Sequence, residues 1–150
     1  MRAPNLMQGY FLHDRPGELQ PPRSEVGEGW YNTGDIVSID DDGFLTIIGR
    51  VKRFAKVAGE MVSLERIEQI AYHAAPAFKH AALVEMTGNG ESTVLMTTDP
   101  ALDRTRLLQA ARELNAQDLA VARRIMRVDN LPLLGTGKVD YVTLSKLVIL

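Results

Sequence analysis

The sequence contains no cysteine among its 150 residues. This absence excludes a disulfide scaffold, a thiolate zinc site and a cysteine nucleophile. The longest apolar runs are also far shorter than the roughly 20 residues that a membrane-spanning helix needs. A strong excess of one charge is missing too: the formal net charge is −2, which gives no overall field that would favour nucleic acid as a partner.

The residues that are present are typical of a folded globular protein. Hydrophobic residues make up 45% of the chain and charged residues 24%, which is enough apolar material for a core of useful size. The length suits one compact domain, or a small domain that carries a piece of a neighbouring one.

The first half of the chain predicts a β-hairpin followed by a helix. The segments "DIVSID" and "GFLTIIG" alternate as strands do, and the Asp-Gly turn between them is a strong hairpin signal. In "SLERIEQIAYHAA" the apolar residues form one helical stripe, and Ser63 is placed to cap the N-terminus of the helix. The basic segment "RVKRFAKVAGE" that precedes this helix is interpreted as a loop.

The second half of the chain predicts a small sheet with further helices. Strands are expected over "KHAALVEMT" and "STVLMTT", joined by a turn, and a short third strand over "RIMRVDNLP". Helices are expected over "DRTRLLQAARELN", starting at Asp99 or Asp103, and over "YVTLSKLVIL". The order of elements predicts an α+β fold, in which helices pack on one side of a small antiparallel or mixed sheet and a β-hairpin comes first.

The segment "LPLLGTGKVD" places Lys138 on a turn with two glycines, Gly135 and Gly137, whose freedom at positive φ lets the backbone approach a bulky group such as a phosphate. The turn is not a Walker-type phosphate loop. That loop needs an earlier glycine and a serine or threonine after the lysine, where this chain has Pro132 and Val139. The three histidines are not spaced as metal ligands, so no metal site is expected in this chain.

Three stretches, "GWYNTGD", "GRVKRFAKVAGEMVSLERIE" and "LPLLGTGKVD", occur in this order along the chain. In order and spacing they resemble the later signature motifs of the adenylate-forming superfamily, which contains acyl-CoA synthetases, peptide-synthetase adenylation domains and luciferases. The resemblance covers nearly the whole chain. It implies a reaction that uses ATP and Mg²⁺ in two steps. A carboxylate attacks the α-phosphate of ATP, giving an acyl-adenylate and pyrophosphate; a thiol then takes the acyl group and AMP leaves.

The resemblance also implies how the chain is divided. Residues 1–50 are expected to be the tail of a large adenylating domain, which binds most of the ATP and Mg²⁺. Residues 51–150 are expected to be a mobile C-terminal lid that rotates between the two steps. The pocket for the fatty acid and the phosphate-binding loop belong to the large domain, so the chain alone is expected to have little or no ligase activity.

Three residues match positions that contact substrates in the family. Asp35 would accept hydrogen bonds from the ribose hydroxyls, which suits a carboxylate because it accepts two bonds. Arg50 would lie near the nucleotide and hold ribose or phosphate oxygens. Lys138 would be catalytic, with its ammonium group between the substrate carboxylate and the α-phosphate. Taken singly, each residue has an ordinary alternative: a turn aspartate, a surface arginine and a solvated lysine.

Two further positions match parts of the family that move or line a passage. Lys52 falls on the hinge position, where a few residues absorb the change in φ and ψ during domain rotation. Gly59 matches the glycine of the loop that enters the thioester site, where the lack of a side chain lets a narrow thiol arm pass. The alternatives are one more lysine of a basic loop and a turn that precedes a helix.

The chain departs from the family pattern at three places. Arg66 replaces the first acid of a common Glu-Ile-Glu motif, and Met61 stands where many relatives have a basic residue. Tyr141 stands where arginine is common. These departures leave Lys138 in place, but they reduce the number of subfamilies that the chain fits.

Within the superfamily, "KRFAKVAGEMVSLERIEQ" and the ending "LPLLGTGKVDYVTL" look like the bifunctional 2-acylglycerophosphoethanolamine acyltransferase/acyl-[acyl-carrier-protein] synthetases. That resemblance implies fatty-acid activation, loading of acyl carrier protein and re-acylation of lysophospholipid at the cytoplasmic side of the bacterial inner membrane. The associated acyltransferase would carry a His-x-x-x-x-Asp motif. None of the histidines is followed by Asp at that spacing, so the acyltransferase half is not expected in this chain.

Other readings remain open at this point. The chain also fits a non-catalytic module that docks on a carrier protein, or the lid of a fatty acyl-CoA synthetase with coenzyme A as the thiol acceptor. Two basic groups offer docking surfaces for an acidic carrier protein through complementary charge, and a solvated strand edge is the alternative for the second group. The groups are Lys52, Arg53 and Lys56, and Arg123, Arg124 and Arg127.

Overall fold

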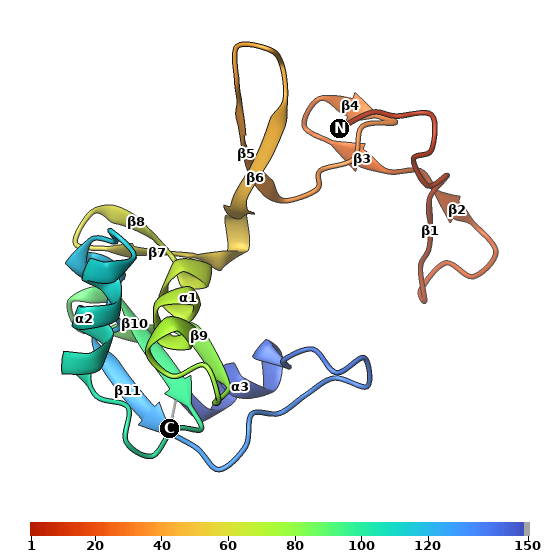
Figure 1. Cartoon of the computed structure of the whole chain (residues 1–150). Coiled ribbons are helices and arrows are strands. Elements are labelled where there is room, and N and C mark those ends of the chain that lie inside the picture. The colour runs from red at the N-terminus through yellow and green to blue at the C-terminus, as the bar shows by residue number, and fades with distance from the viewer. Residues whose placement is uncertain (149–150) are drawn as a thin grey trace. The chain divides into compact units, whose positions relative to one another are not determined.

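The computed structural model describes residues 1–148. The chain divides into two compact units, Met1–Ile48 and Gly49–Leu150. Figure 1 shows the order of helices and strands along the chain. No helix among the described residues has the length and apolar character needed to cross a membrane. The two units are described separately.

The first unit consists of short strand pairs. β1 (Tyr10–Phe11) pairs with β2 (Leu19–Gln20), and β3 (Arg23–Ser24) pairs with β4 (Gly27–Glu28). The expected β-hairpin follows: β5 (Asp35–Ile39) pairs with β6 (Leu45–Arg50), whose last residues belong to the second unit. Asp40 shapes the turn, since its Oδ1 accepts hydrogen bonds from the backbone N–H of Asp42 at 3.1 Å and of Phe44 at 2.8 Å.

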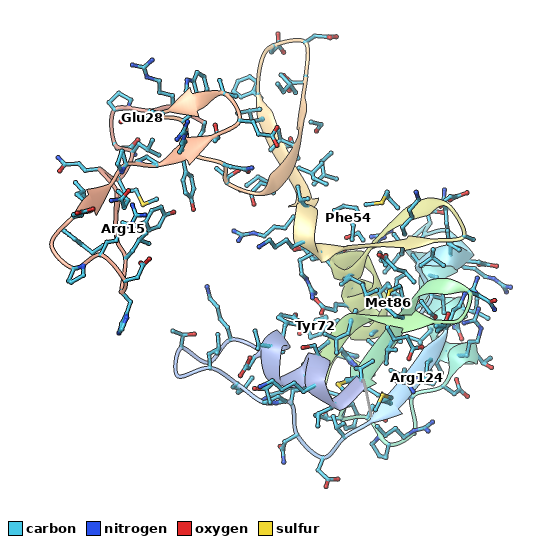
Figure 2. All side chains as sticks on the ribbon, turned by 180° about the vertical axis from the view of Figure 1, so that it is seen from behind. Arg15, Glu28, Phe54, Tyr72, Met86 and Arg124 are labelled. Carbon is cyan, nitrogen blue, oxygen red and sulfur yellow. The ribbon has the colours of Figure 1, made fainter. Side chains whose placement is uncertain are left out.

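The β5–β6 hairpin exposes an unusual number of apolar side chains. Ile39, Phe44, Leu45 and Ile47 are each about two-thirds exposed; Figure 2 draws the side chains of this hairpin as sticks. Within residues 1–48, only Pro22 is buried. A concentration of exposed apolar residues of this kind is typical of a surface that another protein segment covers.

The second unit is built on a mixed sheet with the strand order β11-β10-β9. β9 (His80–Thr87) and β10 (Gly90–Thr97) are antiparallel, and β11 (Arg124–Arg127) runs parallel to β10. The mixed sheet and its three strands confirm the expectation from the sequence.

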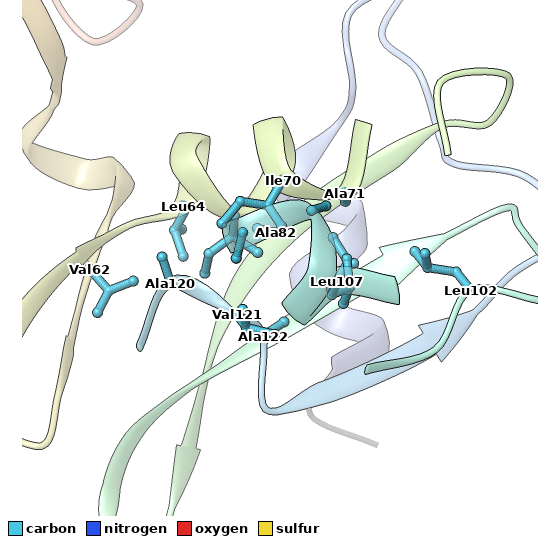
Figure 3. Packing of buried hydrophobic residues seen from close by; sticks show 14 of the residues in the cluster. Val62, Leu64, Ile70, Ala71, Ala82, Leu102, Leu107, Ala120, Val121 and Ala122 are labelled. Atoms are coloured by element: carbon cyan, nitrogen blue, oxygen red, sulfur yellow. The ribbon is translucent and has the colours of Figure 1, made fainter. Parts of the chain in front are cut away.

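One face of this sheet is covered by α1 (Leu64–Ala74) and α2 (Arg104–Glu113). Ser63 caps α1, accepting a hydrogen bond from the Arg66 N–H at 3.3 Å, and Asp103 caps α2 in the same way at 2.8 Å. Both caps follow the sequence prediction. The buried side chains between the helices and the sheet form the main core, which includes Leu64, Ile70, Ala82 and Leu107 (Figure 3).

The opposite face of the sheet is covered by α3 (Tyr141–Val148). Its Leu144 and Val148 pack with Ala81 and Leu83 of β9 in a second buried cluster. The prediction that all helices lie on one side of the sheet is therefore wrong. The reason is the strand period of two, which turns Ala81 and Leu83 away from the face that holds Ala82. The last two residues of the predicted closing helix lie outside the described residues.

The basic segment before α1 is not a loop, as the sequence analysis had it, but a short turn and a hairpin. A 3₁₀ turn, η1 (Val51–Arg53), leads into β7 (Phe54–Val57), which pairs with β8 (Glu60–Ser63). Ala55 and Val57 are buried while Lys56 is exposed, which is the alternation of a half-buried strand. The segment is thus an ordered part of the second unit.

Candidate functional site

The loop that carries Lys138 is a small hairpin of its own. Leu133 and Val139 pair as an isolated antiparallel bridge. The Leu134 N–H donates to the Lys138 carbonyl at 2.8 Å, and the Gly137 N–H donates to the Leu134 carbonyl at 2.8 Å. Gly137 has a φ of 80°, which is the left-handed conformation that closes such a turn and favours glycine. The turn therefore fixes the backbone of the lysine that follows it.

Both ends of this loop are anchored. Leu131 on its N-terminal side is 5% exposed, and the Asp140 N–H donates to the Pro132 carbonyl at 2.9 Å. Asp140 then starts α3, since its Oδ1 accepts from the backbone N–H of Val142 and of Thr143, each at 3.1 Å. Hydrogen bonds from the Thr143 hydroxyl and N–H hold the pKa of the Asp140 carboxyl below its ordinary value.

The side chain of Lys138 points to solvent and is not part of the core. The residue is exposed. Within residues 1–148, no carboxylate or other acceptor holds its ammonium group. The charge is therefore available to a group from outside the second unit.

The residues expected to bind the nucleotide lie at the two ends of the β5–β6 hairpin sequence. Asp35 is half-buried at the start of β5, where its N–H donates to the Thr33 hydroxyl at 3.2 Å. The preceding Gly34 N–H donates to Asn32 Oδ1 at 2.9 Å, so two consecutive side chain–backbone turns shape the approach to Asp35. Arg50 is exposed at the end of β6. Their assignment to the nucleotide stays a prediction.

The residues expected to move or to line a passage are both exposed in the second unit. Lys52 lies in η1, close to the boundary between Ile48 and Gly49 that separates the two units. Gly59 forms the tip of the β7–β8 hairpin with a φ of 88°, beside Ala58 at 52°. The assignment of a hinge and of a thiol passage to these residues stays a prediction, as does the division of roles between the two units.

A surface groove of about 830 Å³ runs between α1 and the Lys138 loop. Leu133, Gly137 and Val139 of the loop line one side, and Glu65 and Gln69 of α1 line the other. Lys138 itself does not line this groove, although its neighbours Gly137 and Val139 do.

A polar cluster next to this loop was not expected from the sequence. Arg53 Nη2 lies 2.6 Å from Glu68 Oε1 and donates to the Tyr141 hydroxyl at 3.3 Å. The Tyr141 hydroxyl donates to the same Glu68 oxygen at 2.9 Å, and the Arg53 guanidinium lies 4.1 Å from the centre of the tyrosine ring. Burial raises the pKa of Tyr141 to about 12, and the Glu68 carboxylate adds to the shift while Arg53 opposes it.

The only sequence signal for this cluster was the departure at Tyr141, where arginine is common in the resembling family. Arg53 itself was assigned to a docking surface, which the structure corrects, because its guanidinium is held by Glu68, Tyr141 and the Ala82 carbonyl.

The second basic group is also smaller than its sequence suggests. Arg124 pairs with Glu85 at 2.9 Å, and Arg127 donates to the Leu102 carbonyl at 3.0 Å. These two arginines bind their own domain, and Arg123 is the member of the group whose side chain makes no such bond in the described part of the chain.

No three histidine, aspartate or glutamate side chains of residues 1–148 gather as the ligands of a metal ion would. The described residues therefore do not form a Mg²⁺ site of their own.

Comparison with known proteins identifies the class of enzyme that this chain resembles. No protein-family model matches the chain. Its curated relatives include AMP ligases and CoA ligases for hydroxybenzoates and medium-chain fatty acids. These relatives and the structural neighbours are adenylate-forming enzymes, and the chain matches them as a C-terminal domain.

Particular relatives give the extent of the match. Component E of enterobactin synthase from Escherichia coli is 36% identical over 146 residues, which cover 93% of this chain and 26% of that protein. The medium-chain-fatty-acid–CoA ligase of Ectopseudomonas oleovorans is 39% identical over 79 residues, 53% of this chain and 13% of the ligase. The crystal structure of ATP-bound MatB from Rhodopseudomonas palustris matches the fold with a TM-score of 0.70 at 22% identity, covering 97% of this chain and 29% of that one.

The chain therefore spans about a quarter of the length of relatives such as the enterobactin synthase component. The comparisons confirm the resemblance to adenylate-forming enzymes and the α+β fold of the C-terminal domain. The finer resemblance to bifunctional acyltransferase/acyl-[acyl-carrier-protein] synthetases stays a prediction.

Proposed function

We propose that this chain is the C-terminal part of an ATP-dependent, AMP-forming acid–thiol ligase, and that Lys138 acts in its adenylation step. In that step a substrate carboxylate oxygen bonds to the α-phosphorus of ATP, and the bond to the departing pyrophosphate breaks. An ammonium group placed between the carboxylate and the α-phosphate orients both and stabilises the negative charge that develops between them.

One observation carries this proposal most directly. The structure presents Lys138 on a hydrogen-bonded turn that is anchored at both ends, yet leaves its ammonium group exposed and without an acceptor among residues 1–148. A lysine that merely solubilises a loop needs no such anchoring. A lysine delivered to a reaction centre needs both a fixed backbone and a free charge.

The other residues take roles in the same reaction. Asp35 would hold the ribose hydroxyls and Arg50 the nucleotide, since a carboxylate and a guanidinium suit a diol and an oxyanion respectively. Lys52 would be the hinge at which the lid rotates, and Gly59 would border the passage for the thiol arm. ATP and Mg²⁺ would be bound mainly by a large domain outside this chain.

For the substrates we propose a fatty acid and acyl carrier protein. The support is the resemblance of "KRFAKVAGEMVSLERIEQ" to acyl-[acyl-carrier-protein] synthetases, together with the similarity to a medium-chain-fatty-acid–CoA ligase. The full-length enzyme would serve the re-acylation of lysophospholipid at the cytoplasmic side of the inner membrane, together with an acyltransferase. Coenzyme A is the alternative acceptor. Hydroxybenzoates are the alternative acids, because AMP and CoA ligases for them are also among the relatives.

The experiment that tests the substrate is exchange of labelled pyrophosphate into ATP by the full-length ligase that contains this chain. A panel of fatty acids and hydroxybenzoates is supplied one at a time, and transfer is then measured to carrier protein and to coenzyme A. We expect exchange with fatty acids and transfer to carrier protein. Exchange with hydroxybenzoates alone contradicts the proposed substrate, and no exchange with any acid contradicts the proposed ligase.

A further inference from the structure

The cluster of Arg53, Glu68 and Tyr141 joins segments that lie far apart in the sequence. Arg53 belongs to η1, Glu68 to α1 and Tyr141 to the first turn of α3. The side chains of Arg53 and Glu68 are only 16% and 21% exposed. These three side chains thus form one half-buried contact between the turn that holds Lys52 and the helix that follows Lys138.

One oxygen atom is the centre of the cluster. Glu68 Oε1 accepts from Arg53 Nη2 at 2.6 Å, from the Tyr141 hydroxyl at 2.9 Å and from the Ala82 N–H at 2.7 Å. Arg53 Nη1 also donates to the Ala82 carbonyl at 3.1 Å. The turn at Lys52 and the start of α3 are therefore fixed to the same point of the sheet.

The cluster does more than hold α3 against the sheet. Leu144 and Val148 already do so through apolar packing. A buried or half-buried ion pair is also a weak source of stability, because desolvation offsets much of the attraction. What hydrogen bonds add to apolar packing is direction: they fix where the first turn of α3, and with it the end of the Lys138 loop, points.

We infer that Arg53, Glu68 and Tyr141 are positioning residues that hold the Lys138 loop in a fixed orientation relative to the turn at Lys52. When the backbone rotates at that turn, the Lys138 loop then moves with it as one rigid body. This inference rests on the proposed function for its purpose, but the coupling itself is a property of the second unit. Tyr141 transmits the coupling because it lies on the same anchored segment as Lys138.

The coupling is tested first in the 150-residue chain, by amide hydrogen exchange measured with NMR. The variants are Tyr141→Phe, which removes one hydroxyl and keeps the ring, and Glu68→Gln. The control is Tyr72→Phe, since Tyr72 is 60% exposed on α1 (Figure 2). We expect the amides of Leu134, Gly137 and Asp140 to exchange about fivefold faster in Tyr141→Phe, as loss of one hydrogen bond allows.

In the same experiment the amides of β10 keep their rates, and the Tyr72→Phe control leaves the loop unchanged. Equal loop exchange in Tyr141→Phe and the control overturns the inference. Should Glu68→Gln fail to fold, the milder Tyr141→Phe variant still decides the question.

The consequence for catalysis is tested in the full-length ligase. We expect Tyr141→Phe to lower kcat of adenylation several-fold with little change in the KM for ATP, and to spare transfer from supplied acyl-adenylate to the thiol. Arg53→Lys keeps the positive charge but loses the forked geometry of the guanidinium. It is therefore also expected to lower kcat of adenylation. Unchanged kcat in Tyr141→Phe, alongside a large loss in Lys138→Ala, contradicts this inference alone. Unchanged adenylation in Lys138→Ala contradicts the proposed function.

Discussion

Leu133 and Val139 pair across the turn that carries Lys138, and the lysine is the residue directly before Val139. The bridge and the hydrogen bonds inside it hold the lysine at the end of a tight turn. The geometry of this turn therefore sets the position of the ammonium group. Substitutions that strain the turn are expected to lower the free energy of unfolding.

The two glycines of the turn are predicted to differ. Gly137 has a φ of 80°, whereas Gly135 has no positive φ, and a Cβ added at either glycine would meet no atom within 4 Å. Gly137→Ala is expected to lower the free energy of unfolding by about 1 kcal/mol, because an alanine side chain is strained at that φ. The matched Gly135→Ala variant is expected to be neutral or slightly stabilising. Urea unfolding of both variants measures the difference, and equal stabilities contradict the turn described for Lys138.

Ala58 is a second site of backbone strain. It has a φ of 52° at the tip of the β7–β8 hairpin, where two-residue turns favour glycine or asparagine. Ala58→Gly is expected to raise the free energy of unfolding by up to about 1 kcal/mol, since relief of strain outweighs the added freedom of the unfolded chain. The control Ala77→Gly, at an exposed residue without positive φ, is expected to destabilise. The same sign of change in both variants, measured by thermal unfolding, speaks against strain at Ala58.

The phenol of Tyr141 is predicted to ionise at an unusually high pH. Its pKa is raised to about 12 from the ordinary value of 10.0, chiefly by burial. A raised pKa means that the folded state binds the phenolic proton more tightly. The stabilisation is therefore fully present below pH 10 and is lost as the pH rises towards 12.

The measurement is the absorbance of tyrosinate during alkaline titration, taken as the difference between the wild-type chain and Tyr141→Phe. This difference isolates one of the four tyrosines. A difference curve with its midpoint near pH 10 contradicts the buried contact with Glu68 and, with it, the basis of the positioning cluster.

Local signals in the sequence were enough for most of the fold. The cap at Ser63 and the apolar stripe through Leu64 and Ile70 predicted α1, and the structure confirms both. The hairpin turn "GNGE" between two expected strands predicted the antiparallel pair of β9 and β10. These features depend on residues that are neighbours along the chain, so local sequence patterns are sufficient to predict them.

One local feature and two features that depend on distant residues were missed. The β7–β8 hairpin was interpreted as a basic loop although Gly59 stands in its turn, and the other turn residue, Ala58, rarely takes positive φ and gives no turn signal. The side of the sheet that α3 covers is decided by tertiary packing on Ala81 and Leu83. The contact between Arg53 and Tyr141 joins residues 88 positions apart, which no local pattern reveals.

The candidate site could be predicted only as a set of separate residues. The turn at Lys138 was identified from its glycines, and the structure adds that it is anchored at both ends and that the charge is exposed. That combination follows from Leu131 and Asp140 on either side of the loop, whose burial and capping roles appear only in the folded chain.

The most direct measurement is the effect of Lys138→Ala on the two half-reactions of the full-length ligase, with Lys146→Ala as the control at an exposed lysine of α3. The account predicts that Lys138→Ala slows acyl-adenylate formation about 100- to 1,000-fold, the order of effect expected for loss of one group that stabilises transition-state charge. Thiol transfer from supplied adenylate is spared, and Lys146→Ala changes neither step. An equal loss of both steps in Lys138→Ala, or no loss of the first, contradicts the role assigned to this lysine.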